Sequence, residues 1–391
     1  MLQAKLKNGQ MIIPSMMPRT RLPLLKKETY YCPVCAEKVV LRAGEKVIPH
    51  FAHSPKTLCP TASGGEGVYH EKGKLLLFRW LQKQGLCVEL EAYLPEIRQR
   101  PDFLIHLKGR RIAIEYQCTR IAENDIIART FGYKKAGIEV VWILGERLMK
   151  RKNAQTLSID SFSKTVIHQF TPGYPFSLFY FCPLSKNLLK FQDISFTRKN
   201  RASGKLTLLP LDKSKFTDLF KKEFLPPTTL KQIWKREKRN FRLRKRNRLF
   251  GEELKWQRWL YLKGTHFEQL PAMIHLPVPG AFTIHVPSWI WQSWIVLDII
   301  SPRPLHATIS LEQCMKRLGK ALLPLERFPL LPPSTNPVLA YLKLLTTLGI
   351  LVQTSGTSFK KAVPIHFHHQ LEQALQDDDR LVEKLFKTLK R

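Results

Sequence analysis

Two carboxylates and an amide lie on two short segments that the sequence predicts to be neighbouring strands. Asp102 opens the first segment, residues 102–107, while Glu115 and Gln117 lie in the second, residues 111–118. Side chains alternate along a strand, so Glu115 and Gln117 share one face, and a hairpin turn at 108–110 brings Asp102 beside them. Such an oxygen-rich set suits Mg²⁺ or Mn²⁺, which polarises a phosphodiester and activates water. The alternative interpretation is the solvated face of an edge hairpin.

A second group of residues has the spacing of a zinc site. Cys32 and Cys35 form a two-residue-spaced pair, and His50, His53 and Cys59 follow within a short distance. Four such ligands make a closed tetrahedral site, which stabilises a module too small for a large core. We expect structural Zn²⁺ on Cys32, Cys35, His53 and Cys59, with His53 favoured over His50. The alternative is free thiols and surface histidines.

The elements that must position the carboxylates follow from the apolar pattern. A helix is expected over 70–84, with strands over 86–94, 102–107 and 111–118, a second helix over 123–136 and a buried strand over 138–144. The order is therefore αβββαβ. Glu71 on the first helix would join the carboxylates, whereas Lys74 on that helix is either a DNA contact or an ordinary surface residue. Arg129 and Tyr133, four apart on the second helix, form either a phosphate clamp or a surface pair.

The order of these residues resembles the PD-(D/E)xK nuclease superfamily, with Gln117 in place of its usual lysine. The set His70-Glu71-x-x-Lys74, Arg100-Pro101-Asp102, Glu115-x-Gln117, Arg129-x-x-x-Tyr133 and residues 141–144 resembles the competence protein CoiA family, as does the zinc-type segment before it. The resemblance is strong over about residues 30–145.

This resemblance implies a restriction-endonuclease-like α/β core in a cytosolic factor that acts on incoming single-stranded DNA during transformation. It also implies that Glu71, Asp102, Glu115 and Gln117 are the catalytic residues. A neutral amide cannot act as a cation toward the transition state, so Lys74 or Arg129 would supply the missing charge.

The charge balance is consistent with a polyanionic partner. The 64 Lys and Arg residues oppose 31 Asp and Glu, which gives a formal net charge of +33. A basic stretch at 231–248 offers candidate DNA contacts at Arg242, Arg244, Lys245 and Arg246, with a solvated charged helix as the alternative. Ribosome association or an anionic membrane surface would explain the same total charge.

The 391 residues predict several domains. We expect a zinc module at 1–62, a nuclease domain at 63–150 after the glycine-containing segment 61–67, and a mainly α-helical basic region at 151–391. Within that region, a helix over 336–348 followed by two short strands suggests a winged helix. No apolar stretch approaches the ~20 residues of a membrane span, and the seven cysteines are scattered, so a cytoplasmic protein is expected.

Three functions remain open from the sequence. The leading one is a metal-dependent DNA nuclease or DNA-processing factor, with recombination or DNA-uptake proteins as further partners. The second is a non-catalytic single-stranded DNA-binding or recombinase-loading protein that retains a nuclease fold. The third, an RNA-binding or ribosome-associated protein, leaves the polar cluster on the hairpin unexplained.

Overall fold

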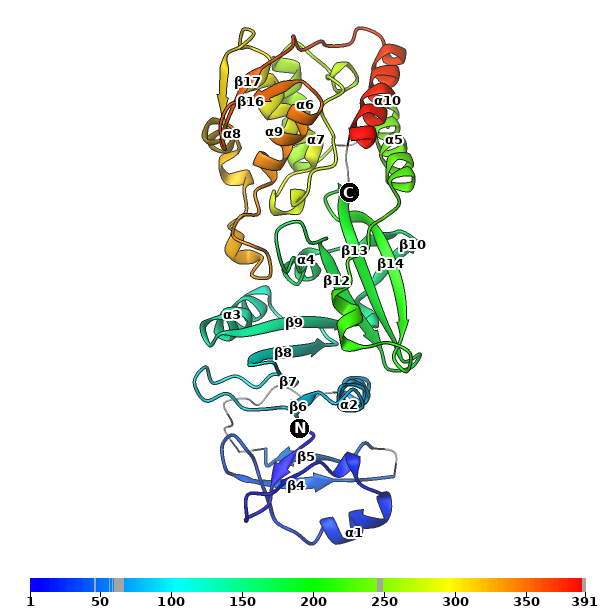
Figure 1. Ribbon diagram of the computed structural model, residues 1–391, viewed down its shortest axis with the longest axis vertical. Helices are drawn as coiled ribbons and strands as arrows, with labels where there is room; N and C mark the ends of the chain where they lie inside the picture. Colours follow the sequence, from blue (N-terminus) through cyan, green and yellow to red (C-terminus); the bar gives the residue numbers. More distant parts are fainter. Residues whose placement is uncertain (46, 56, 58, 60–66, 245–248, 389–391) are drawn as a thin grey trace.

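Three parts follow one another in chain order in the computed structural model, which describes residues 1–45, 47–55, 57, 59, 67–244 and 249–388. Figure 1 shows a small sheet at one end, a large sheet in the middle and a mainly helical part at the other end. In the described part of the chain, no helix is both long and apolar enough to cross a membrane.

The N-terminal module is built on a five-stranded sheet in the order β2-β1-β3-β4-β5. Its apolar cluster is small and includes Tyr30, Cys32, Val39 and Phe51. So small a core needs a further source of stability, such as a bound metal. The elements are β1 (Ala4–Lys5), β2 (Met11–Ile12), α1 (Leu22–Leu25), β3 (Tyr30–Tyr31), β4 (Lys38–Arg42) and β5 (His50–His53).

The central part begins with the expected element order. It consists of α2 (Val68–Gln82), β6 (Cys87–Leu90), β7 (Phe103–Leu107), β8 (Arg110–Gln117), α3 (Glu123–Lys135) and β9 (Ile138–Gly145). Strand β7 is antiparallel to β6 and to β8, while β9 runs parallel to β8 after the α3 crossover. Phe103 pairs with Ile114, so Asp102 lies opposite Glu115 in the register of the two strands.

Both faces of this sheet are covered. Ile112, Ile114 and Tyr116 pack in the cluster that contains the apolar residues of α2. Ala113, between them, packs in the opposite cluster with Tyr133 of α3 and with Trp142. The hairpin of β7 and β8 is therefore not a solvated sheet edge over its central residues, and the Glu115 side chain lies in a packed interior.

The sheet continues well beyond residue 150, which corrects the expectation of a mainly helical region from 151 onward. Strand β12 pairs in parallel with β9, and the nine-stranded order is β10-β11-β14-β13-β12-β9-β8-β7-β6. The boundary expected at residue 150 thus falls within one sheet. The added elements are β10 (Lys150–Asn153), β11 (Thr156–Ser158), α4 (Ser161–Thr165), β12 (Ser177–Cys182), β13 (Asn187–Arg198) and β14 (Arg201–Pro210).

The sequence hides these strands for a physical reason. All six residues of β12 are buried, so the strand lacks an alternation of apolar and polar residues. The register between β13 and β14 also shifts between Gln192 and Ser195, where an irregularity interrupts the two-residue period. Strand β12 therefore lacks the alternating pattern of a half-exposed strand, and in the pair of β13 and β14 that pattern is interrupted.

The C-terminal part is mainly helical around a tryptophan-rich core that includes Trp256, Trp289 and Trp291. The expected helix and two strands are present, and β15 joins them in a small sheet with the order β15-β17-β16. The elements are α5 (Pro227–Leu243), α6 (Gly251–Leu262), α7 (Ser288–Ile295), β15 (Thr308–Ser310), α8 (Leu311–Leu318), α9 (Pro337–Thr347), β16 (Leu351–Gln353), β17 (Ser358–Lys361) and α10 (Leu371–Thr388).

Candidate functional site

Three cysteines and a histidine of the N-terminal module come together in space. The ligand atoms of Cys32, Cys35, His53 and Cys59 all lie within 4.8 Å of one another. The sulfur of Cys35 is 3.3 Å from Nε2 of His53, and the backbone N–H of Val34 donates to the sulfur of Cys32 at 3.4 Å. This is the donor set and spacing of a closed zinc site, with His53 rather than His50 as the fourth ligand.

The ionisation of these groups depends on a cation. Burial raises the pKa of the Cys35 thiol to about 11, so without a metal the thiol keeps its proton at neutral pH. Burial lowers the pKa of His53, which favours the neutral imidazole that binds metals. A Zn²⁺ ion bound here would displace thiol protons and stabilise the module.

Asp102 lies among three groups that stabilise its charge. Its Oδ2 accepts the backbone N–H of Tyr116 at 2.8 Å, while Nζ of Lys74 lies 3.4 Å from Oδ1. Nε2 of His70 is 3.7 Å from Oδ2 and only 2.6 Å from the carbonyl oxygen of Tyr116. Burial alone would raise the pKa of Asp102, but Lys74 and His70 bring it down to about 2. Asp102 is therefore ionised at any ordinary pH.

Glu115 has the opposite electrostatic setting. The side chain is 2% exposed, and its Oε1 accepts a hydrogen bond from Arg129 at 2.5 Å and another from the hydroxyl of Tyr133. Burial raises the pKa of Glu115 to about 7, against the lowering effect of Arg129 and with the help of the Asp102 charge. Two neighbouring carboxylates with such different pKa values are typical of functional sites.

The residues expected from the sequence are only partly brought together. Asp102 and Glu115 are adjacent, and Arg129 and Tyr133 both contact Glu115 rather than forming a surface pair. The side-chain amide of Gln117 donates hydrogen bonds to the carbonyl and hydroxyl oxygens of Thr119, so it is engaged with the segment that follows β8.

Glu71 lies on the border with the N-terminal module. It is buried, and its Oε1 is 3.7 Å from Nδ1 of His50, which belongs to β5 of that module. The zinc ligands are the one group of three or more His, Cys, Asp or Glu side chains, within the described residues, whose ligand atoms converge. A divalent ion at Asp102 and Glu115 would therefore need further oxygen ligands, for which the carbonyl of Tyr116 is well placed.

Two residues at this site were not among the expected site residues, although His70 belongs to the pattern on which the family resemblance rests. His70 precedes Glu71 on α2, and its first-turn position beside a candidate acid was the available signal. Glu91 left no signal, because it lay inside a predicted strand. In the structure its backbone has φ of 50°, its N–H donates to the carbonyl of Asp102 at 2.9 Å, and its Oε1 lies 2.5 Å from Nζ of Lys74. Lys74 itself is fully buried, so it faces the site and not the solvent.

The basic stretch departs from expectation at Arg242. This side chain is 1% exposed and makes a two-point ion pair with Asp378, at 2.9 and 3.0 Å. It therefore joins α5 to α10 instead of contacting DNA, because α5 uses its apolar and part of its basic face for packing. Arg244 is partly exposed, 3.6 Å from Glu253, whereas Lys245 and Arg246 lie outside the described residues.

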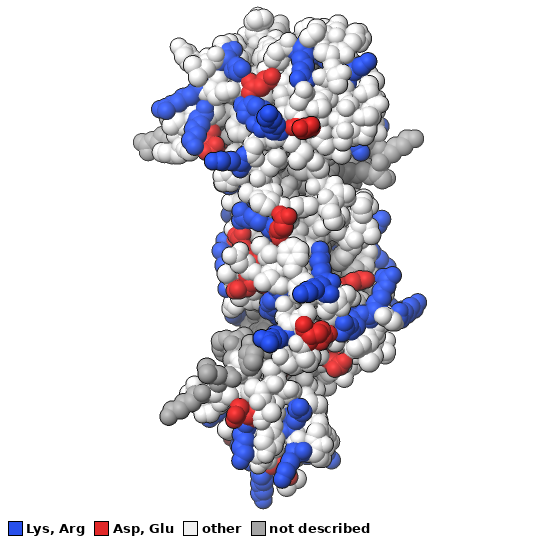
Figure 2. All heavy atoms as spheres, turned by 90° about the vertical axis from the view of Figure 1, so that its left-hand side faces the viewer, with Lys and Arg blue, Asp and Glu red and all other residues white. Residues whose placement is uncertain are grey.

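Positive charge is distributed widely over the surface. On the face shown in Figure 2, lysine and arginine side chains occur on all three parts of the molecule, with acidic groups among them. A single basic helix is thus not needed to account for the net charge.

Comparison with known proteins identifies the family. The chain matches three family models in succession: the N-terminal domain of competence protein CoiA over residues 16–62, its nuclease-like domain over 66–224 and its C-terminal domain over 230–375. The chain belongs to the competence protein CoiA family. The CoiA nuclease-like match extends from α2 to beyond β14, in agreement with the single nine-stranded sheet.

A relative of established name supports the same assignment. Competence protein CoiA of Bacillus subtilis (strain 168) is 27% identical over 361 residues, which are 90% of this chain and 95% of the relative. No solved structure gives a significant match.

Proposed function

We propose that this CoiA-family protein is a Mg²⁺- or Mn²⁺-dependent deoxyribonuclease that acts on DNA, single-stranded by preference, during competence and recombination. The observation that carries the proposal is the pairing of Asp102 with Glu115 across β7 and β8, with Lys74 and His70 beside them. The αβββαβ order around them supports a restriction-endonuclease-like core, and the net charge of +33 favours a polyanionic substrate.

The donors present fit a hard divalent cation. Asp102 and Glu115 would hold it together with the carbonyl oxygen of Tyr116, and His70 lies within reach of the same atoms. The ion would supply Lewis acidity toward a phosphate oxygen and a more acidic water. The protein groups fix the ligand oxygens: Tyr116 N–H orients Asp102, and Arg129 with Tyr133 orients Glu115.

Lys74 is the cation that we assign to the place of the missing superfamily lysine. It comes from α2 rather than from β8, and its ammonium is within 3.4 Å of Asp102. Gln117 donates to Thr119 instead, so we give it no charge-stabilising role. Arg129 is the second cation of the site, held against Glu115 with about a third of its side chain exposed.

Several further aspects belong to this proposal. We assign the catalytic core to residues 63–150. The strands up to residue 210 continue the sheet of this core, and residues 1–62 form a zinc-binding module. A reducing cytoplasm suits a protein in which Cys32, Cys35 and Cys59 form no disulfide. Arg244, Lys245 and Arg246 stay candidate DNA contacts, and DNA-uptake or recombination proteins stay candidate partners.

A non-catalytic DNA-binding protein is the second candidate. The observation that favours it is the occupation of Glu115 by Arg129 and Tyr133, together with its raised pKa, since both oppose binding of a cation. In that case the nuclease fold would hold DNA for another protein.

One assay separates the two functions. Labelled single-stranded and double-stranded DNA are incubated with the purified protein and Mg²⁺, Mn²⁺ or no added metal, next to an Asp102→Asn variant. Metal-dependent cleavage that the variant lacks would support the nuclease. Binding of DNA with no cleavage in either metal would reject it in favour of the second candidate.

A further inference from the structure

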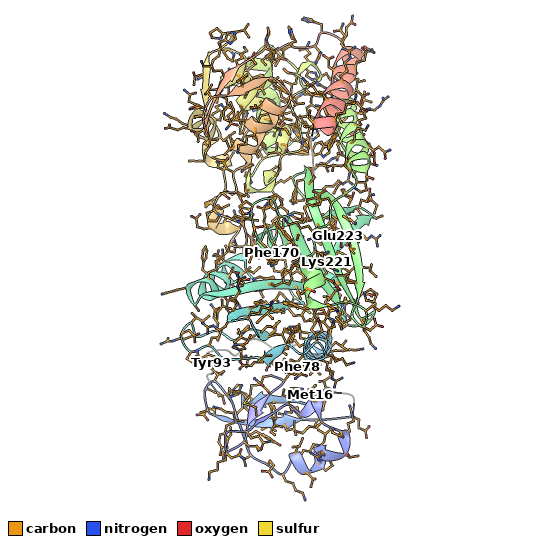
Figure 3. The ribbon with its side chains drawn as sticks, in the orientation of Figure 1. Met16, Phe78, Tyr93, Phe170, Lys221 and Glu223 are labelled. Carbon is orange, nitrogen blue, oxygen red and sulfur yellow. The ribbon has the colours of Figure 1, made fainter. Side chains whose placement is uncertain are left out.

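The N-terminal module is docked against the site through its first residues. Leu2 is fully buried, and it packs in the apolar cluster of the central part with Phe78 and Phe103. Met16 of the module lies close to α2, where Nε of Arg79 donates to its sulfur at 3.3 Å, and Figure 3 labels Met16 near Phe78 of the same helix. The guanidinium of Arg79 on α2 donates to the carbonyl oxygen of Ser15 at 3.2 Å. Leu2 is thus a constituent of the central core.

This docked segment is tied both to the zinc-binding strand and to Glu91. The N–H of Phe51, on β5, donates to the carbonyl of Met1 at 2.9 Å, and β5 carries the zinc ligand His53. The next backbone N–H, that of Leu2, donates to Oε2 of Glu91, also at 2.9 Å. A short path of hydrogen bonds therefore runs from the zinc-binding strand to the carboxylate of Glu91.

Glu91 in turn contacts both Lys74 and Asp102. Its Oε1 accepts a hydrogen bond from the ammonium of Lys74 at 2.5 Å, and its backbone N–H donates to the carbonyl of Asp102. The carboxylate is 2% exposed, and its positive φ is a conformation that non-glycine residues adopt at a cost. The contacts of Glu91 with the Lys74 ammonium and with the backbone N–H of Leu2 offset the cost of its burial and of its backbone conformation.

We propose that Glu91 is a positioning residue through which the zinc module keeps the Lys74 ammonium paired with Glu91, which leaves the Asp102 carboxylate available to a cation. The module then contributes to the geometry of the site and is not a separate DNA-binding domain. The cleavage consequence rests on the proposed nuclease function, but the effect on cation binding does not require catalysis.

The physical reason is that the Lys74 ammonium and a divalent cation compete for the carboxylate of Asp102. A buried ammonium needs a counter-charge, and Lys74 has Glu91 at 2.5 Å and Asp102 at 3.4 Å. If Glu91 becomes neutral, Lys74 shifts its pairing to Asp102. A divalent cation must then displace the ammonium, so its affinity falls even in a correctly folded protein.

The test compares Glu91→Gln with Glu89→Gln in the full chain. Glu89 lies on β6 two residues earlier, is largely exposed and pairs with His106 at the surface, so it is a matched control. We expect Mn²⁺ affinity, measured by calorimetry on zinc-loaded protein, to fall about tenfold or more in Glu91→Gln and to stay unchanged in Glu89→Gln. Native far-UV circular dichroism and full zinc content establish that each variant is folded.

A second variant tests the role of the module. Leu2→Ala removes apolar contacts of the docked segment but keeps the backbone N–H, so it loosens the tie without changing any charge near Lys74. We expect it to weaken Mn²⁺ binding several-fold in the wild-type background and to have no further effect in Glu91→Gln, because the two act through the same pairing. If Glu91→Gln folds poorly, Leu2→Ala alone still tests the link, because unchanged Mn²⁺ affinity in that variant would contradict it.

The outcomes distinguish this inference from the proposed function. A folded Glu91→Gln protein with wild-type Mn²⁺ affinity would refute the positioning role, and additive effects of the two variants would refute the link to the module. If wild-type protein binds Mn²⁺ but cleaves no DNA, the nuclease function fails while the affinities still test the positioning. Absence of Mn²⁺ binding in the wild type overturns both.

Discussion

The ammonium of Lys74 lies 3.4 Å from Oδ1 of Asp102, although the two residues come from a helix and from a strand start. Lys74 is fully buried at this point, and Gln117, which occupies the position of a superfamily lysine, donates its amide to Thr119 instead. A positive charge is therefore present at the carboxylates, but α2 supplies it. One of the following predictions depends on this exchange of positions.

Replacement of either carboxylate should abolish metal-dependent cleavage. Asp102→Asn and Glu115→Gln each remove a charged ligand but preserve shape, so we expect at least a hundredfold loss of turnover with DNA affinity within about twofold of wild type. Gel-based cleavage and fluorescence anisotropy measure the two quantities. Asp125→Asn, an exposed change on α3, is the control. Undiminished cleavage by both variants would eliminate the nuclease assignment.

Lys74 should matter more for turnover than Gln117. We expect Lys74→Gln to lose roughly a hundredfold or more in cleavage rate, since a buried cation near the reacting phosphate is removed. Gln117→Ala should stay within a few-fold of wild type. Gln117→Lys, which restores the superfamily residue, should keep or raise activity. A larger loss in Gln117→Ala than in Lys74→Gln, in single-turnover assays with Mn²⁺, contradicts the proposed exchange.

The raised pKa of Glu115 predicts a pH-dependent loss of stability. Its pKa is about 7 in the folded protein against a usual 4.5, so the folded protein binds this proton more tightly than the unfolded chain does. The stabilisation is complete below about pH 4.5 and is lost as the pH rises through 7. Glu115→Gln, which stays neutral, should therefore gain about 1–3 kcal/mol relative to wild type between pH 5 and pH 8. Urea unfolding without added Mg²⁺ or Mn²⁺ measures this difference, and an equal pH trend in both proteins would exclude it.

Zinc content should follow the four converging ligands. Native protein should contain about one zinc per chain, and Cys32→Ser or His53→Ala should lower both zinc content and solubility. His50→Ala is the informative control because His50 lies on the same strand but outside the ligand set. Elemental analysis that finds zinc lost in His50→Ala and kept in His53→Ala would reverse the assignment.

Arg242 should act on stability rather than on DNA. Arg242→Ala removes the two-point partner of the buried Asp378 carboxylate. Asp378 keeps Lys238 at 3.0 Å, so we expect a cost of about 1.5–3 kcal/mol in unfolding free energy. Arg239→Ala, an exposed change on the same helix, should cost little. The salt dependence of DNA binding by folded Arg242→Ala should match wild type, whereas a flatter slope would show that Arg242 does reach phosphate.

The local elements around the site could be read from the sequence because each is short, periodic and bounded by turn residues. Asp102 and Glu115 were placed together since hairpin register follows from the turn at Lys108 and Gly109, which both have positive φ. The spacing of Cys32, Cys35, His53 and Cys59 predicted a zinc site, and the structure brings their ligand atoms together. These are inferences over short stretches, where the geometry of the chain leaves few alternatives.

The remaining features depend on tertiary packing. Strand β12 pairs with β9 only because the chain returns after α4, and its wholly buried residues carry no periodicity. The role of Glu91 depends on Leu2, which is 89 positions away. Arg242 looked like a surface charge because its partner Asp378 lies in the last helix. No local pattern contains these pairings.

The docking of Leu2 also has a consequence for how the chain is made. The candidate metal site can close once Cys59 has been synthesised, whereas the Glu91 carboxylate and the Phe103 side chain against which Leu2 packs follow only after it. Until then the Leu2 side chain has no apolar cover, so chaperones or other chains can bind it. The N-terminal module therefore reaches its docked position only after the strands that it packs against have been synthesised.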